Sequence, residues 1–487
     1  MTGFLGWKAD KQANLKAEYR NVPPESQRAQ KNSTMRVVYL TAGAAGMFCG
    51  SCMHDNALAK SLVANNVECL LQPVYTPIRT DETSVASSRV FLGGIHVYLL
   101  QQMPWLRFLP HRLRGVLDFP PLIRWATRKA GGTDPAVLGE LAVSMLRGAD
   151  GHQAQEFEKL TRWIADEIQP DAVVLTNLLI GGGLPELRQR LPKAKLIVML
   201  QGDDIFLDHL PVASRSAAIE LCTGLVQHVD HFCVHSRFYA QKMAALLEIP
   251  DEKVAIMPLS IDLDPFANLP PREPVSAKEF RLGYLARIAP EKGLHRLVEA
   301  FERIAQHEPD ITLHAAGWLG TENQAYLDSL LERLRRAGLQ DRFTYHGSPD
   351  LKGKVEFLRS LDLLSVPTEY EDPKGLFVLE SLAAGTPVVM PDHGAFGELI
   401  ASTGGGLLID PGSIDALCDA IRSLKNDPGK REAMAAAGAA AVAAKHTIGQ
   451  SAQSLADLID GVSKAENALD ERPGSHTDTP GAFEPYL

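Results

Sequence analysis

Four carboxylates gather around the start of one predicted helix. Glu369, Glu371 and Asp372 lie in the loop before it, and Glu380 follows Asp372 by eight positions. Eight residues are a little over two helical turns, which keeps Asp372 and Glu380 near one helical face. The free N–H groups of a helix N-terminus also bind anions. The place is therefore suited to a polar ligand, and the alternative is a solvated helix with ordinary surface acids.

Two cations stand five positions apart in another loop. Arg287 and Lys292 follow the predicted strand at 280–285, and Gly293 comes directly after them. The planar guanidinium of an arginine and the compact charge of a lysine can converge on phosphate oxygens. The alternative is that both side chains are solvated in a surface loop.

The elements that would position these groups can be read from the apolar pattern. An apolar segment ends at Pro367, and helical spacing runs from Leu376 to Gly385, where Gly and then Pro387 signal a helix end. The apolar run at 388–390 predicts the next strand. Strand, loop, helix and strand describe a parallel sheet, in which ligands bind at the carboxyl ends of the strands.

The stretch at 365–391, S-V-P-T-E-Y-E-D-P-K-G-L-F-V-L-E-S-L-A-A-G-T-P-V-V-M-P, resembles the donor-site signature of the retaining, family-4 type glycosyltransferases of the GT-B fold, the glycosyl transferases group 1. Their pattern is Glu, seven residues and Glu, then a helix ending in a G-x-P-V-V strand. Asp372 stands for the first Glu, with Glu371 adjacent, and Lys374 replaces the usual aromatic residue before Gly375. The segment R-x-x-x-x-K-G at 287–293 is similar to the same family's phosphate loop.

The resemblance implies a role for each matching residue. Arg287 and Lys292 would hold the diphosphate, Glu380 the ribose hydroxyls, and Asp372, less so Glu371, the donor sugar. Further residues expected at the donor site are Gly50, Gly347, Gly375, Leu376 and Phe377.

The first half of the chain supplies candidates for acceptor or sugar contacts: His54, Gln201 and Asp203. The family usually presents a His in H-G-x-D where this chain has Gln201, and a glutamine amide cannot exchange protons. In the front-face mechanism ascribed to the family, the leaving phosphate takes the acceptor's proton, so transfer does not need that His. Asp203 and Asp204 also suggest the metal pair of one-domain glycosyltransferases, but two domains and phosphate cations favour a metal-free site.

Two strand–helix cycles around a Pro-rich linker imply two facing Rossmann-like domains, an α/β fold of doubly wound parallel sheets. The predicted boundaries are a polar extension at 1–34, a first domain at 35–267 with a helical insertion at about 100–160, a linker at 268–277, a donor domain at 278–445, a helix at 446–464 that returns to the first domain, and a disordered tail at 465–487.

Composition narrows the functional class. The 487 residues carry a formal charge of −10, which argues against a nucleic-acid binder. No apolar run reaches bilayer length and no signal-peptide core is seen, so cytoplasmic residence is expected. The insertion contains Trp105, Phe108 and Trp125 among basic residues. It can lie on the inner face of an anionic membrane or, as we favour, pack on its own domain.

The pair Cys49 and Cys52 has C-x-x-C spacing, and we favour small residues in a tight turn over a redox or zinc site. A glycine-rich turn at 43–51 also fits a dinucleotide site, but it lacks the spacing G-x-G-x-x-G.

The sequence predicts a metal-independent, retaining glycosyltransferase. It would use a UDP-, GDP- or ADP-sugar and an unidentified acceptor, with no cofactor. The alternatives are a nucleotide-sugar epimerase or hydrolase of the same fold, a non-catalytic nucleotide-sugar binder and, least favoured, a dehydrogenase.

Overall fold

The computed structural model describes residues 34–43, 50–76, 78, 80, 83–87, 90–91, 135–267, 269 and 279–461. The predicted extension at 1–34, except its last residue, lies outside these residues. So do the linker, except residue 269, the tail, Cys49 and the three aromatic residues of the insertion.

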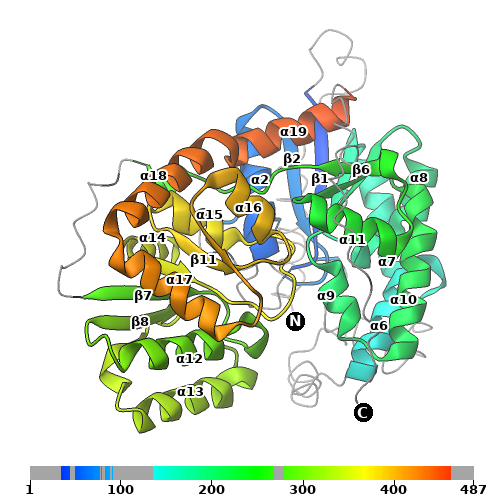
Figure 1. Ribbon diagram of the computed structural model, residues 1–487. Helices are drawn as coiled ribbons and strands as arrows, with labels where there is room; N and C mark the ends of the chain where they lie inside the picture. The colour runs from blue at the N-terminus through cyan, green and yellow to red at the C-terminus, as the bar shows by residue number, and fades with distance from the viewer. Residues whose placement is uncertain are drawn as a thin grey trace, which may run out of the picture. The chain divides into compact units, whose positions relative to one another are not determined.

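Two six-stranded sheets, both entirely parallel, organise the described chain (Figure 1). The first sheet has the order β2-β1-β3-β4-β5-β6. Its strands are β1 (Arg36–Thr41), β2 (Glu68–Pro73), β3 (Ala172–Leu175), β4 (Lys195–Met199), β5 (His231–Val234) and β6 (Val254–Ile256). The second sheet has the order β12-β11-β10-β7-β8-β9. Its strands are β7 (Phe280–Leu285), β8 (Ile311–Ala316), β9 (Phe343–Tyr345), β10 (Leu363–Ser365), β11 (Val388–Pro391) and β12 (Gly406–Ile409).

Helices connect the strands of each sheet. Those of the first half are α2 (Gly50–Ala64), α6 (Pro135–Leu146), α7 (Ala154–Arg162), α8 (Leu184–Arg190), α9 (Asp203–Asp208), α10 (Val212–Leu225) and α11 (Arg237–Leu247). Those of the second half are α12 (Leu294–Ala305), α13 (Gln324–Arg336), α14 (Leu351–Arg359), α15 (Leu376–Ala383), α16 (Phe396–Thr403), α17 (Ile414–Asn426), α18 (Pro428–Lys445) and α19 (Ile448–Asp460).

Each sheet has its own apolar core. The inner strands of both sheets are almost wholly buried, as near-continuous runs of Val, Leu and Ile in a sheet covered on both faces require. In the second half α12 packs against α13 and α17, whereas α15 packs against α14 and α18. Crossovers that run in opposite directions from the centre of the sheet place these two groups on opposite faces.

The alanine-rich end of the chain consists of three helices, α17, α18 and α19, and α19 lies within the helix predicted at 446–464. Asp427 caps α18 and Pro428 opens it, since a proline is tolerated only in the first turn. Thr447 and Gln450 form a capping box that starts α19. This last helix packs against α2 of the first half, and Ile448 N donates to Ile261 O.

Two further helices of the first half begin at local signals. The glycines at 181–183 belong to a 3₁₀ segment (Leu178–Gly183) that runs directly into α8. Ser236 accepts a hydrogen bond from Tyr239 N and so caps α11.

Candidate functional site

The second sheet changes direction between β7 and β10, which are neighbours in the sheet although β8 and β9 come between them in the chain. Ligands of doubly wound sheets bind at such a switch point. The loop after β7 holds Arg287 and Lys292, and the loop after β10 holds the acids at 369–372. Gly293 lets the loops touch. Its φ is +74°, and a Cβ there would lie 1.8 Å from the carbonyl oxygen of Pro367.

Lys292 joins the two loops. Its Nζ lies 2.8 Å from Oδ2 of Asp372, and it also contacts the hydroxyl of Tyr370. The same Nζ stands 4.8 Å from the centre of the Tyr370 ring, within cation–π range. Tyr370 in turn donates to Oδ2 of Asp372 at 3.0 Å. The lysine is therefore held in one place before any ligand arrives.

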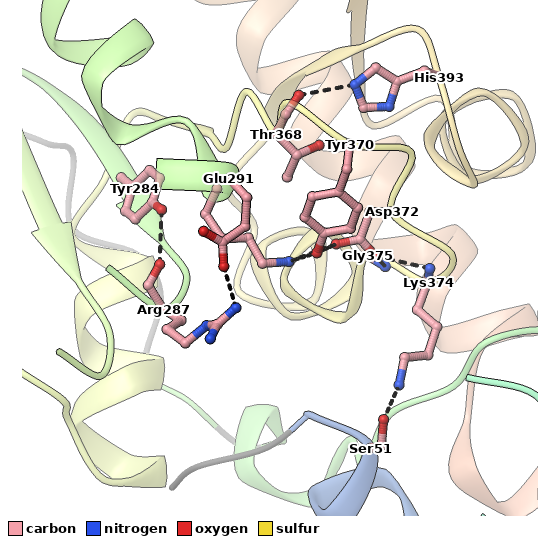
Figure 2. Close-up of polar contacts among 11 residues, drawn as sticks. Ser51, Tyr284, Arg287, Glu291, Thr368, Tyr370, Asp372, Lys374, Gly375 and His393 are labelled. Atoms are coloured by element: carbon pink, nitrogen blue, oxygen red, sulfur yellow. Dashed lines mark hydrogen bonds and ion pairs between the residues drawn. The ribbon is translucent and has the colours of Figure 1, made fainter. Parts of the chain in front are cut away.

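Asp372 holds Lys292 and Tyr370 from a buried position (Figure 2). Its Oδ1 accepts from the backbone N–H groups of Lys374 and Gly375 at 3.0 and 3.1 Å. Burial alone would raise the pKa of Asp372, but the Lys292 ammonium, the Lys374 N–H and the Tyr370 hydroxyl outweigh it and lower the pKa to about 2. Asp372 is thus a buried anion that positions Lys292 and the start of α15.

A cleft of about 1110 Å³ opens beside these loops, with walls from both halves of the chain. The predicted site residues that line it are Gly50, His54, Gln201, Arg287, Lys292, Glu371, Leu376, Phe377 and Glu380. Four others lie behind its wall: Asp203, Gly347, Asp372 and Gly375. Gly347 directly precedes Ser348 and Pro349, which do line the cleft. Of the two adjacent acids, Glu371 lines the cleft and Asp372 does not.

Glu380 is paired with a residue that the sequence did not reveal. Its Oε1 lies 2.6 Å from Nζ of Lys354, a largely buried lysine on α14 that also lines the cleft. The two residues are 26 positions apart with no spacing rule between them. Only the fold brings α14 against α15.

Among the described residues that line the cleft, Arg287 is the most exposed lysine or arginine. Its side chain is 42% exposed and pairs with Glu291, four positions further along the chain (Figure 2). A pair this exposed adds little to stability, so the guanidinium can turn toward a ligand at small cost.

Lys374, which replaces the family's aromatic residue, reaches the first half of the chain. Its Nζ lies 2.6 Å from Oγ of Ser51 and 3.1 Å from Oε1 of Gln201. Gln201 in turn donates a hydrogen bond from Nε2 to Oδ1 of the buried Asp55, at 3.0 Å. The two departures from the family pattern, at positions 201 and 374, are thus partners in one hydrogen bond.

The acidic pair after β4 splits into two environments. Asp203 accepts from Leu178 N at 2.7 Å and Gln201 N at 3.2 Å, and burial raises its pKa to about 7. Asp204 accepts from the Tyr239 hydroxyl and pairs with Lys242 Nζ at 3.0 Å. Lys242 also lies 3.0 Å from Oε2 of Glu371.

Metal-ligating side chains do not cluster in the part of the chain that the structure describes: no group of three or more His, Cys, Asp or Glu is arranged to hold an ion. Cys52 is buried on α2, 3.9 Å from Oγ1 of Thr41. Nor does any helix among the described residues have the length and apolarity to cross a bilayer.

Residues 266–441 match the family model described as Glycosyl transferases group 1. This part of the chain is similar to the glycosyl transferases of group 1. The matched residues include the loop after β7, the loop after β10, α14 and α15, so every second-half residue of the candidate site lies within them.

Curated relatives match part of the chain. Mannosyltransferase LpsB of lipopolysaccharide core biosynthesis from Rhizobium meliloti is 32% identical over 188 residues, 38% of this chain and 52% of the relative. Glycogen synthase from Mycobacterium tuberculosis is 32% identical over 162 residues, 32% of this chain and 38% of the relative. The chain thus spans about half or less of the length of these relatives.

Solved structures share the whole fold. Sucrose-phosphate synthase from Thermosynechococcus elongatus has a TM-score of 0.63 at 17% identity, over 88% of this chain and 99% of that chain. HepE from Anabaena in complex with UDP has a TM-score of 0.62 at 17% identity, over 88% and 100%. These similarities confirm the predicted fold, two Rossmann-like domains of the GT-B type.

Proposed function

We propose that the protein is a retaining glycosyltransferase that moves a sugar from a nucleoside diphosphate sugar to a hydroxyl acceptor without a metal ion. The observation that carries the proposal is the fixed position of Lys292. Asp372 and Tyr370 hold its ammonium group at the switch point, beside the N-terminus of α15 and on the same cleft as Arg287. Preorganised cations and helix N–H groups stabilise charge that grows on a leaving phosphate.

The residues take the following roles in this proposal. Arg287 and Lys292 bind the diphosphate, with the first N–H groups of α15 at Leu376 and Phe377, which have no partner inside a helix. Glu380, fixed by Lys354, accepts hydrogen bonds from the ribose hydroxyls. Glu371 meets the donor sugar from the cleft surface, and Asp372 acts as a positioning residue.

Transfer would break the bond between the anomeric carbon and the phosphate oxygen and form a bond from that carbon to the acceptor oxygen on the same face. The acceptor's proton passes to the departing phosphate, and the cations stabilise the negative charge on that phosphate. Gln201 cannot exchange protons, so its place in the cleft is compatible with this route.

Support for the donor comes from relatives. Structures of HepE from Anabaena hold UDP and UDP-glucose, and a GDP-mannose-dependent mannosyltransferase of Mycobacterium tuberculosis is 27% identical over 72% of its length. We propose a UDP-, GDP- or ADP-sugar as donor and cytoplasmic residence. Membrane contact through the insertion at about 100–160 stays a prediction, since its aromatic residues lie outside the described chain.

A thermal-shift screen against UDP-, GDP- and ADP-sugars tests the proposal, because a ligand that binds the folded state raises its melting temperature. We expect one nucleotide series to raise it, and no shift in any series would contradict the donor site. Chelator should leave activity unchanged, and dependence on manganese would contradict the metal-free site.

One observation favours a second candidate. Gln201, where the family has a proton-exchanging His, is also what a non-catalytic nucleotide-sugar binder would tolerate. Such a protein would bind the donor, and Arg287→Ala would weaken this binding. It would show no turnover with any acceptor. Product analysis with donor alone separates the remaining alternative, because an epimerase converts its donor fully without an acceptor.

A further inference from the structure

The first-half wall of the cleft carries buried polar atoms that nothing else in the described chain satisfies. They are both ring nitrogens of His54, Nε2 of His235 and Oγ of Ser260. Their side chains belong to residues only 3%, 7% and 1% exposed. Folded proteins leave few buried polar atoms unpaired, so three such residues in one region indicate a ligand that pairs with them.

The three residues belong to segments at the carboxyl edge of the first sheet. His235 follows β5 and Ser260 follows β6, and these two strands are neighbours. His54 lies on α2, and its ring meets that of His235 edge-on, with the centres 5.0 Å apart. His54 and Ser260 both line the cleft. The carboxyl edge is where this class of sheet binds its ligands.

The three side chains are uncharged. Nδ1 of His235 lies 2.9 Å from the carbonyl oxygen of Met257, which can only accept, so Nε2 of His235 is a free acceptor. Burial, then the neighbouring His235 and Lys374, hold the pKa of His54 well below its usual value. Its ring is therefore neutral near pH 7 and offers one donor and one acceptor. The Ser260 hydroxyl can do both.

We propose that His54, His235 and Ser260 form a subsite that binds hydroxyl groups of an uncharged sugar or polyol. A hydroxyl both donates and accepts, as these groups do in return. A phosphate would need cationic donors, which the three residues do not supply. The subsite rests on the proposed function, because the hydroxyl belongs either to the donor sugar or to the acceptor.

The test compares wild type with His54→Phe, His235→Phe and Ser260→Ala. Titration calorimetry with UDP and UDP-glucose, with GDP and GDP-mannose, and with ADP and ADP-glucose measures how much the sugar adds to nucleotide affinity. A second arm adds glucose, mannose or myo-inositol to the nucleotide-saturated protein and measures the melting temperature. His228→Phe is the control, since His228 lies in a short segment (Val226–His228) that does not line the cleft.

We expect His54→Phe to lower one of two affinities about tenfold, as the loss of a hydrogen bond predicts. It is either the affinity that the donor sugar adds to the nucleotide or the affinity for the free sugar or polyol. A fall in the first arm assigns the hydroxyl to the donor, and a fall in the second assigns it to the acceptor. His54→Asn, which restores a donor and an acceptor, should recover most of the response. Nucleotide affinity should not change.

The ligand-free melting temperature separates binding from a structural role. Replacing an unpaired buried ring by an apolar one of similar shape is neutral or stabilising, so His54→Phe should melt at or above wild type. A lower melting temperature with unchanged sugar responses overturns the subsite, as do variants that match wild type in both arms. If wild type binds no nucleotide, the proposed function fails instead.

Discussion

Asp372 and Lys292 show how one pair can serve both stability and binding. The sequence placed an acid and a cation in neighbouring loops, and the resemblance assigned the acid to the sugar. The structure instead uses its carboxylate four times inside the protein, for Lys292, Tyr370 and two backbone N–H groups. Burial of a side chain within a loop leaves no mark in the sequence, which is why Asp372 and Glu371 could not be told apart there.

Removing a charged group of the site should slow transfer strongly. We expect Lys292→Ala or Glu380→Ala to lower the rate by about two orders of magnitude, which is typical for the loss of a charge-stabilising group. Initial rates at saturating donor measure this. Near-normal rates in both variants would place the site elsewhere.

Asp203 should make stability depend on pH. Burial raises its pKa to about 7 in the folded protein, whereas an unfolded chain has about 3.9. Between these values the folded state holds a proton that the unfolded state lacks, so the free energy of unfolding decreases as pH rises from about 4 to about 7.

Asp203→Asn keeps an acceptor oxygen but cannot ionise, so we expect it to remove this component. Melting temperatures of both proteins at about pH 5 and about pH 8 measure it. The melting temperature of the variant relative to wild type should be higher at the higher pH than at the lower pH. An equal difference at both values would show that Asp203 does not titrate in this range.

At the scale of elements, local signals were sufficient wherever glycine and proline mark the end of a helix. Helix α15 and strand β11 were predicted from apolar spacing, Gly385 and Pro387, and the structure has them at Leu376–Ala383 and Val388–Pro391. Composition gives no boundary between α17 and α18, because helix propensity is high throughout this segment and the boundary is set by the cap Asp427 and the following Pro428. Contacts between elements, such as Lys354 with Glu380, depend on packing and could not be predicted.

The contact of the two phosphate-site loops depends on Gly293. An alanine there must adopt a left-handed conformation and would place its Cβ 1.8 Å from Pro367 O. Gly338 has a similar φ of +69°, with nothing within 4 Å of a Cβ. Both substitutions carry the conformational cost of about 1 kcal/mol, and only Gly293→Ala adds a clash.

We therefore expect Gly293→Ala to lower the melting temperature more than Gly338→Ala and to weaken nucleotide binding, whereas Gly338→Ala leaves binding unchanged. Calorimetric melting and nucleotide titration measure the two effects. Equal melting temperatures for the two variants would show that the loops separate freely.

At the scale of the whole molecule, side chains connect the two domains across the cleft. Lys374 contacts Ser51 and Gln201, and Glu398 of α16 accepts from Arg237 N and Phe238 N at the start of α11. Neither link was predictable, because each joins residues more than a hundred positions apart.

Lys374→Met keeps the length of the side chain but removes its donor group. We expect a loss of about 1–3 kcal/mol in the free energy of unfolding, because Gln201 loses a buried partner. Lys352→Met is the control on the same domain, since Lys352 is 85% exposed and should matter by less than about 0.5 kcal/mol. Urea unfolding measures both, and equal midpoints would contradict a stabilising link across the cleft.

The most direct test of the proposed nucleotide site uses Arg287, because removing Lys292 would also leave the buried Asp372 carboxylate without its ion-pair partner. Arg303→Ala is the matched control: Arg303 also pairs with a glutamate four positions away, is similarly exposed, and lies on α12 outside the cleft. The measurement is the rise in melting temperature with a saturating nucleoside diphosphate sugar. Wild type and Arg303→Ala should rise equally and Arg287→Ala much less, whereas an equal rise in all three would show that the diphosphate does not bind at this cleft.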